Sequence, residues 1–338
     1  MTERANQVKI QSLQPNNELL ILSQSQLNQL DIDLNMVLKV VESAFIGLRQ
    51  GSQNPQKTIV QPEAEQSISY SMVGRDIVSQ TIGFKVVYEF DPYRKFNNYN
   101  FLSFIFLCDD QTGHPIALMD VATLGPLRTA ATSALMARAT CPDAKIALVV
   151  GTGAQGQMAL PLLVAALPQL EKLQIFGHYK DGIIAAQNTL KRYFPERQIE
   201  VITSLEQAAN NADIIIGVAG ASAKRQVKHQ WMKPNSIAIL VGYGVDADVF
   251  QTADRIITTD IEQMKVTCGD LLKDDGHLPP IHAELPDILI GSKTAKLHQG
   301  EIVFAYNSGM VVTDIALGRY LADQALQKAT LGQMVTLW

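Results

Sequence analysis

The 338-residue sequence predicts an α/β protein in two parts, and three observations support this. Short β-like segments follow one another through residues 58–119. A glycine triplet at residues 151–156 directly follows an apolar stretch. From there, strand-like and helical segments alternate as far as residue 258. Such alternation is typical of a parallel sheet with helices on both faces, whereas consecutive strands joined by short turns indicate an antiparallel sheet.

Residues 146–157 have the pattern of a strand, a tight turn and a helix N-terminus. Gly151 permits the turn, Gly153 lets the backbone approach a ligand, and Gly156 lets the helix lie close to the strand. The helix N-terminus favours a bound phosphate. A plain glycine turn is the alternative, but the flanking segments favour a Rossmann-type dinucleotide-binding domain. The residues expected against the cofactor phosphates are Gly151, Thr152, Gly153, Ala154, Gln155 and Gly156.

Hydrophobic periodicity predicts the other elements. Residues 28–49 repeat apolar side chains at helical spacing before Gly51. Strands are expected at 57–60, 67–72, 81–88, 101–107 and 116–120, the last two joined by a hairpin turn at 109–113. A helix of small residues is expected at 128–137. After the glycine loop, strands are expected at 173–176, 199–202, 213–217, 236–241 and 255–258. An amphipathic helix at 313–326 ends the pattern.

Composition limits the classes of partner. Hydrophobic residues make up 47% of the chain, which is enough for a large core and is typical of two domains. A net charge of -5 attracts neither nucleic acid nor an anionic membrane, so a small molecule is the expected partner. Three cysteines without metal-like spacing, and the lack of an export or membrane segment, predict a cytoplasmic protein.

The end of the second predicted strand of the dinucleotide domain indicates the cofactor. A carboxylate at this position would bind the adenosine ribose and repel a 2′-phosphate. The sequence has Phe176-Gly177-His178-Tyr179-Lys180 instead, with no carboxylate before Asp181. His178 and Lys180 could accept the additional phosphate charge. NADP is therefore favoured, and NAD is the alternative.

Three blocks with fixed order and spacing resemble the ornithine cyclodeaminase/μ-crystallin family: Ala117–Asp120, Leu127–Ala131 and Val150–Gly156. With Gly83–Lys85 upstream and Asn307–Gly309 downstream, the resemblance covers most of residues 40–325. It implies chemistry on α-amino or α-imino acids and a homodimer formed through the strands. We expect a substrate-binding and dimerisation domain at 1–125, with 313–338 packing back on it, and a dinucleotide-binding domain at 126–312.

The resemblance also implies roles for individual residues. Lys85 matches the lysine beside the reacting carbon, and Arg128 matches the arginine that grips the substrate carboxylate through two parallel N–H groups. Lys57 stands where the family usually has a second arginine. It keeps the positive charge but lacks the paired N–H groups of a guanidinium. The other positions implied at the substrate are Asn100, Asp246, Ser308 and Gly309, and Thr129 is implied at the cofactor.

One departure bears on the reaction. Family members that cyclise ornithine place an aspartate where this chain has Gly244, although Asp246 or Asp248 could take over that role. We therefore expect an NAD(P)H-dependent imino-acid reductase or amino-acid dehydrogenase. The alternatives are an ammonia-releasing cyclodeaminase with tightly bound NAD, and a non-catalytic NADP-dependent binding protein like μ-crystallin. No catalytic metal is expected, because His277 and His282 lack further ligands at suitable spacing.

Overall fold

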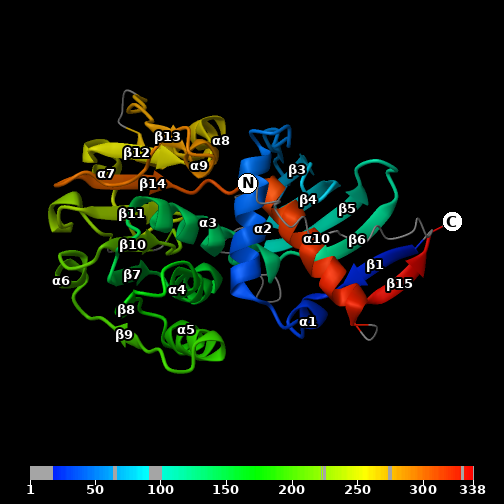
Figure 1. The fold of residues 1–338 in the computed structure, drawn as a ribbon, viewed down its shortest axis with the longest axis horizontal. Coiled ribbons are helices and arrows are strands. Elements are labelled where there is room, and N and C mark those ends of the chain that lie inside the picture. The colour runs from blue at the N-terminus through cyan, green and yellow to red at the C-terminus, as the bar shows by residue number, and fades with distance from the viewer. Residues whose placement is uncertain are drawn as a thin grey trace, which may run out of the picture.

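The computed structural model describes residues 18–63, 67–90, 101–221, 223, 226–272, 276–328 and 331–337. Two β-sheets lie side by side, and the long helices run through the middle of the molecule between them (Figure 1). These helices are α2 (Leu34–Gly47), α3 (Leu124–Thr140) and α10 (Val311–Gln327). They pack against one another, so the two sheets share one continuous core.

The first sheet, here the mixed sheet, has seven strands in the order β15-β1-β6-β5-β4-β3-β2. Their bounds are Glu18–Leu22 (β1), Thr58–Val60 (β2), Ile68–Asp76 (β3), Thr81–Glu89 (β4), Phe101–Asp109 (β5), Pro115–Asp120 (β6) and Gln333–Thr336 (β15). From β2 to β6 all neighbours are antiparallel, as predicted. Gly113, with a φ of +73°, lies in the predicted turn between β5 and β6.

Two strands that were not predicted extend the antiparallel sheet at one edge and make it a mixed sheet. Strand β1 pairs with β6 in parallel, and β15 pairs with β1 in antiparallel orientation. Neither β1 nor β15 was predicted. Each is short and pairs with a segment distant in sequence, so no hairpin turn marks it locally.

Helix α10 packs across β3, β4 and β5, on what we call the inner face of the mixed sheet. Two strand glycines allow this close approach. A Cβ on Gly74 would lie 2.9 Å from Cγ1 of Val311, and a Cβ on Gly83 would overlap the side chain of Ile315. The C-terminal helix was predicted at 313–326 and does pack back on the mixed sheet.

Two further helices were predicted approximately. The periodicity at 28–49 corresponds to α2, which begins after Asp33, whose carboxylate accepts a hydrogen bond from the N–H of Asn35. The short helix α1 (Gln24–Leu27) precedes it. Helix α3 is longer than the predicted 128–137, and its small side chains, among them Ala130 and Ala134, are buried between neighbouring helices.

The second sheet, here the parallel sheet, has eight strands in the order β13-β12-β14-β11-β10-β7-β8-β9. Every neighbouring pair is parallel, as predicted. The strands are Ile146–Val150 (β7), Lys172–Phe176 (β8), Ile199–Val201 (β9), Ile214–Gly217 (β10), Ser236–Leu240 (β11), Arg255–Thr258 (β12), Ala283–Glu284 (β13) and Ile302–Tyr306 (β14). Strands β13 and β14 were not predicted.

Short helices connect the strands of the parallel sheet. They are Ala154–Ala166 (α4), Lys180–Tyr193 (α5), Leu205–Ala209 (α6), Ala247–Thr252 (α7), Ile261–Thr267 (α8) and Leu285–Leu289 (α9), with 3-10 turns at His229–Trp231 and Gly269–Leu271. The alternation of strand and helix produces a Rossmann-type arrangement, with α4 leading directly from the glycine loop. Within the described ranges, no helix is both long enough and apolar enough to cross a bilayer.

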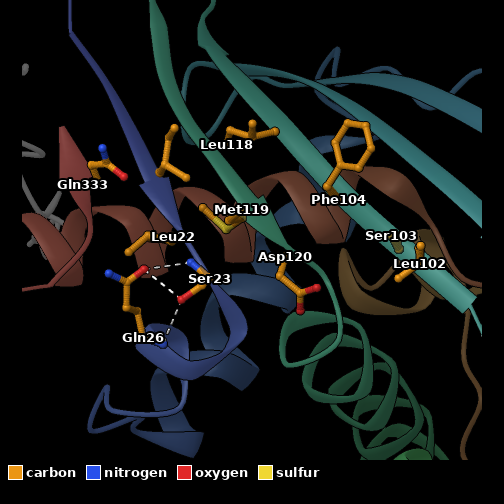
Figure 2. Close-up of a pocket in the computed structure, with 11 residues that line it drawn as sticks. Leu22, Ser23, Gln26, Leu102, Ser103, Phe104, Leu118, Met119, Asp120 and Gln333 are labelled. Atoms are coloured by element: carbon orange, nitrogen blue, oxygen red, sulfur yellow. Dashed lines mark hydrogen bonds between the residues drawn. The ribbon is translucent and has the colours of Figure 1, made fainter. Parts of the chain in front are cut away.

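The outer face of the mixed sheet, opposite α10, exposes large apolar side chains. Phe84 is 45% exposed, Phe104 48% and Leu102 50%. Beside them is a hollow of about 640 Å³, which Figure 2 shows with Phe104, Leu118 and Asp120 along its wall. Neighbouring residues of a strand point to opposite faces, so Ile105 points away from the face of Phe104. Lys85 is directly opposite Ile105 on the next strand and therefore lies on the inner face with it.

The contact between α10 and β4 yields the first prediction. The substitution Gly83→Ala should lower the free energy of unfolding by about 1–3 kcal/mol, because its Cβ would overlap Ile315 in a packed core. Gly269→Ala is the matched control, since a Cβ there has no described atom within 4 Å, and its effect should stay within about 0.5 kcal/mol. Urea unfolding followed by circular dichroism measures both. Equal stability of the two variants would contradict the packing argument.

Candidate active site

Lys85, the residue predicted to exchange a proton, is buried in the mixed sheet. It lies on β4, on the inner face, and 5% of its surface is exposed. Its Nζ donates a hydrogen bond to Oδ1 of Asp314 at 2.9 Å. Burial lowers the pKa of Lys85 below its usual value, and nearby Arg128 adds to this effect, whereas Asp314 opposes it. Lys85 can therefore release a proton more readily than an exposed lysine.

Arg128 is in the first turns of α3 and reaches the same carboxylate. Its Nε donates to Oδ1 of Asp314 at 3.1 Å. Gly309 lies against the guanidinium, because a Cβ at that position would come within 2.7 Å of Nη1 of Arg128. Among the described residues, none accepts a hydrogen bond from the two terminal nitrogens of Arg128. These nitrogens can therefore bind the carboxylate of a substrate.

Asp314 joins the two cations, and the sequence analysis did not identify it. It lies in the first turn of α10 and is 1% exposed. Its position within an apolar helix was the available signal, since a carboxylate is rarely buried without a partner. The sequence could not indicate which cation that partner was. Together, Lys85, Arg128 and Asp314 retain one net positive charge, which suits an anionic ligand.

Lys57 lies near this cluster, over an aromatic ring. Its Nζ is 4.9 Å from the centroid of the Tyr70 ring. Tyr70 is on β3 directly opposite Val87, so its side chain is on the same face of the sheet as Lys85. The structure thus places the Lys57 ammonium against a side chain of the inner face, and Tyr70 was not among the predicted residues. Asn100 lies outside the described residues.

The loop after β14 holds two of the predicted residues at the carboxyl edge of the parallel sheet. Asn307 donates hydrogen bonds to the carbonyl of Thr129 and to Oγ of Ser133, each at 3.0 Å. The hydroxyl of Ser308 is 2.6 Å from that of Thr259. These bonds tie α3 and β14 together, and they place Gly309 beside Arg128. Thr129 itself is 4% exposed.

The glycine loop between β7 and α4 has the geometry that the sequence predicts. Gly151 has a φ of +125°, and a Cβ there would lie 2.6 Å from the N of Ala219. A Cβ on Gly156 would overlap the carbonyl oxygen of Gly151. A Cβ on Gly153 has no described atom within 4 Å, so this side of the loop is open to a ligand.

The residues of this loop fit a dinucleotide cofactor. The N-terminus of α4, which is capped by the backbone of Gly153, lies at the open side and favours a phosphate. In addition, Oε1 of Gln155 is buried and has no hydrogen-bond partner among the described residues. A bound group with a hydroxyl or N–H could satisfy this acceptor.

The end of β8 matches the prediction of a loop without a carboxylate. The ring of His178 lies edge-on to Phe176, with centroids 5.2 Å apart, and Lys180 is the first residue of α5. Gly177 and Gly182 pack around Thr152 of the glycine loop, since a Cβ on Gly182 would lie 2.7 Å from its Oγ1. This contact brings the His178–Lys180 segment beside the glycine loop.

Asp246 and Asp248 both take part in local structure. The carboxylate of Asp246 caps α7 by accepting a hydrogen bond from the N–H of Asp248 at 3.1 Å. Asp248 accepts one from the N–H of His229. Asp246 also lines a cavity of about 320 Å³ with Tyr243. Gly244, at the position of the family's aspartate, has a φ of +115° and packs on Val150.

A metal centre is not evident in the part of the chain that the structure describes. There, no group of three or more histidine, cysteine, aspartate or glutamate residues is placed to hold an ion. The cationic cluster is also unsuited to a metal, because Lys85 and Arg128 already neutralise the Asp314 carboxylate.

Comparisons with known proteins show which fold this is. The chain is 24% identical over 323 residues to a Delta(1)-pyrroline-2-carboxylate reductase of Bacillus cereus, covering 92% of the chain and 98% of that protein. The Delta(1)-pyrroline-2-carboxylate reductase of Thermococcus litoralis, solved with NADH and L-proline, has a TM-score of 0.79 at 24% identity, covering 93% of this chain and 99% of that one. An archaeal alanine dehydrogenase dimer with bound NAD has a TM-score of 0.79 at 21% identity, over 95% and 100% of the two chains.

These likenesses confirm the predicted fold, a Rossmann-type parallel sheet beside a mainly antiparallel one. The model of the ornithine cyclodeaminase/mu-crystallin family matches residues 18–329. The match covers nearly all of the chain, including the glycine loop and the three residues of the charge cluster. The chain therefore belongs to the ornithine cyclodeaminase/mu-crystallin family.

Proposed function

We propose that the protein is an NAD(P)H-dependent oxidoreductase that reduces the C=N bond of an α-imino acid, or oxidises the corresponding α-amino acid. The observation that carries this proposal is the buried cluster of Lys85, Arg128 and Asp314. A loop that follows β14 at the carboxyl edge of the parallel sheet, where Rossmann folds bind dinucleotides, lies against this cluster. The relatives named as pyrroline-2-carboxylate reductases support the same reaction type.

Each residue of the cluster has a distinct part in this reaction. Arg128 binds the substrate carboxylate through its terminal nitrogens, and Lys57 adds a second positive charge. Lys85 gives its proton to the imine nitrogen, which becomes the amine nitrogen, and is left neutral. Asp314 holds Lys85 and Arg128 in place. The orientation of the substrate and the neutralisation of its charge would supply most of the acceleration.

The hydride that reduces the imine carbon comes from the reduced nicotinamide when that cofactor is bound. The open glycine loop, Gly151 to Gly156, would hold its pyrophosphate. Solved relatives contain NADH or NAD. We nevertheless favour NADP for this chain, because His178 and Lys180 stand where a ribose-binding carboxylate would repel a 2′-phosphate.

Two other functions are less well supported. A cyclodeaminase needs an anchor for the distal amine of ornithine, but Asp246 and Asp248 are engaged in capping α7 and bonding His229. A non-catalytic binding protein would not need a buried lysine paired with a carboxylate, and Lys85 has this costly arrangement. A reductase needs no anchor for a distal amine, and it uses the buried lysine as its proton donor.

We also propose that the outer face of the mixed sheet pairs with a second copy of the chain. Phe84, Leu102 and Phe104 would otherwise leave a contiguous apolar surface in water. Leu102 and Phe104 also line the hollow in Figure 2, so this surface is not flat. The archaeal alanine dehydrogenase with the same fold is described as a dimer. The free cysteines Cys108, Cys141 and Cys268 suit a reducing compartment, so we expect the dimer in the cytoplasm.

The proposed reaction is tested with a panel of α-imino and α-amino acids and both nicotinamides, following absorbance of the reduced cofactor. Lys85→Ala should abolish turnover but leave cofactor binding intact, because Lys85 acts in the transition state. Arg128→Lys should chiefly weaken substrate binding, by about 1–3 kcal/mol, and so raise KM. The lysine keeps the positive charge but lacks the two parallel N–H groups of the guanidinium. Ammonia release from ornithine without net cofactor change would instead identify a cyclodeaminase, and tight ligand binding without turnover a binding protein.

The cofactor preference is tested by titration with NADPH and NADH. NADPH should bind more tightly, and Lys180→Ala should reduce the difference by roughly 1.5–3 kcal/mol, because one charge-assisted contact to the 2′-phosphate is lost. Lys191→Ala, at the other end of α5, is the matched control and should change neither affinity. Equal affinities for the two cofactors in the unmodified protein would overturn the preference for NADP.

The proposed dimer is tested by light scattering at micromolar concentration. The unmodified chain should have the mass of a dimer, and Phe104→Glu should give a monomer because it places a charge in the proposed interface. Ile184→Glu is the control, since Ile184 is 44% exposed, close to the 48% of Phe104, but lies on α5, far in the fold from the mixed sheet. A monomeric unmodified chain, or an undisturbed Phe104→Glu dimer, would contradict this assignment.

A further inference from the structure

The ammonium of Lys57 lies over the aromatic ring of Tyr70. Tyr70 is on β3, and its ring carries the Lys57 ammonium at 4.9 Å from the centroid, within the range of a cation–π interaction. Because Tyr70 is opposite Val87, its side chain is one pleat from Lys85 on the same face. The ring of Tyr70 therefore contacts Lys57 and also lies within electrostatic range of Arg128 and Asp314.

We propose that Tyr70 is a positioning residue that holds the Lys57 ammonium over its ring as the second cation for the substrate carboxylate. The inference rests on the proposed function. A lysine has a flexible stem and a single point charge, so by itself it orients a carboxylate poorly. An aromatic face beneath the ammonium restricts it and stabilises its charge, which partly replaces the rigid fork of an arginine.

The charged groups around Lys57 agree with this role. Burial lowers the pKa of Lys57, and the carboxylate of Glu89 on β4 opposes the shift. Burial raises the pKa of Tyr70 to about 12, with further effects from Glu89, Arg128 and Asp314. The phenol is therefore uncharged at neutral pH, and its ring can hold a cation without forming an ion pair.

This arrangement has a consequence for pH dependence. Lys57 binds a carboxylate well only as the ammonium, which is present below its pKa and is lost as the pH rises through it. Since burial lowers that pKa, the proton is lost earlier than from an exposed lysine. The Tyr70 ring favours the charged form, so removing the ring should lower the pKa further.

The test compares Tyr70→Leu with Tyr70→Phe. Tyr70→Leu should raise KM for Δ1-pyrroline-2-carboxylate about 3- to 30-fold with a smaller change in kcat, and should move the alkaline limb of kcat/KM to lower pH. Tyr70→Phe keeps the ring, so its KM and the pH of its alkaline limb should stay close to those of the unmodified protein. In a Lys57→Arg background, Tyr70→Leu should no longer move the limb, because a guanidinium does not titrate in this range.

A direct titration keeps this test separate from the proposed reaction. In protein with ¹³C-methylated lysines, NMR assigns Lys57 through the signal missing from Lys57→Arg and follows its pKa. Tyr70→Leu should lower that pKa and Tyr70→Phe should not. If Phe behaves like Leu in both measurements, or if Leu changes neither, the positioning role is wrong. A Lys57 pKa that responds as expected in a protein that reduces no imino acid would refute the proposed function only.

Discussion

A single buried carboxylate, that of Asp314, constrains the site and much of the fold around it. Lys85 comes from β4, Arg128 from α3 and Asp314 from α10, and both cations bond the same oxygen. Removing Asp314 would leave the cations of Lys85 and Arg128 without their shared counter-charge in a buried environment, at a cost of about 3–5 kcal/mol. The strand and the two helices must therefore keep a fixed relation, and the substrate pocket is rigid where the proton transfer is proposed.

Close backbone packing brings these elements together. On the mixed sheet, Gly74 and Gly83 let α10 approach until its first turns lie over β4. On the parallel sheet, Gly151 and Gly156 do the same for α4 and the loop after β10. In both places a Cβ would have displaced a helix. The glycines of the mixed sheet thus allow the Asp314 carboxylate to lie near Lys85. Those of the parallel sheet allow the N-terminus of α4 to lie beside the glycine loop.

The charge distribution favours an anionic substrate and gives less support to a distal amine anchor. Lys57, Lys85 and Arg128 carry three positive charges against the two carboxylates of Asp314 and Glu89, which leaves a net positive charge. The segment after β11 instead uses its aspartates for local structure, because Asp246 caps α7 and Asp248 accepts a hydrogen bond from His229. Specificity therefore follows from how each loop is folded as much as from which residues it contains.

The sequence by itself determined the elements whose signals are local. The glycine loop, strands β3 to β8 and the alternation that defines the parallel sheet were predictable, because turn glycines and side-chain periodicity act over a few residues. The family blocks also indicated Lys85 and Arg128. Only the tertiary structure decided the rest: the edge strands β1 and β15, the partner of Lys85, and the Tyr70 ring beneath Lys57. Asp314 is 229 residues from Lys85 along the chain, and such pairings depend on how sheets and helices pack, which no local pattern records.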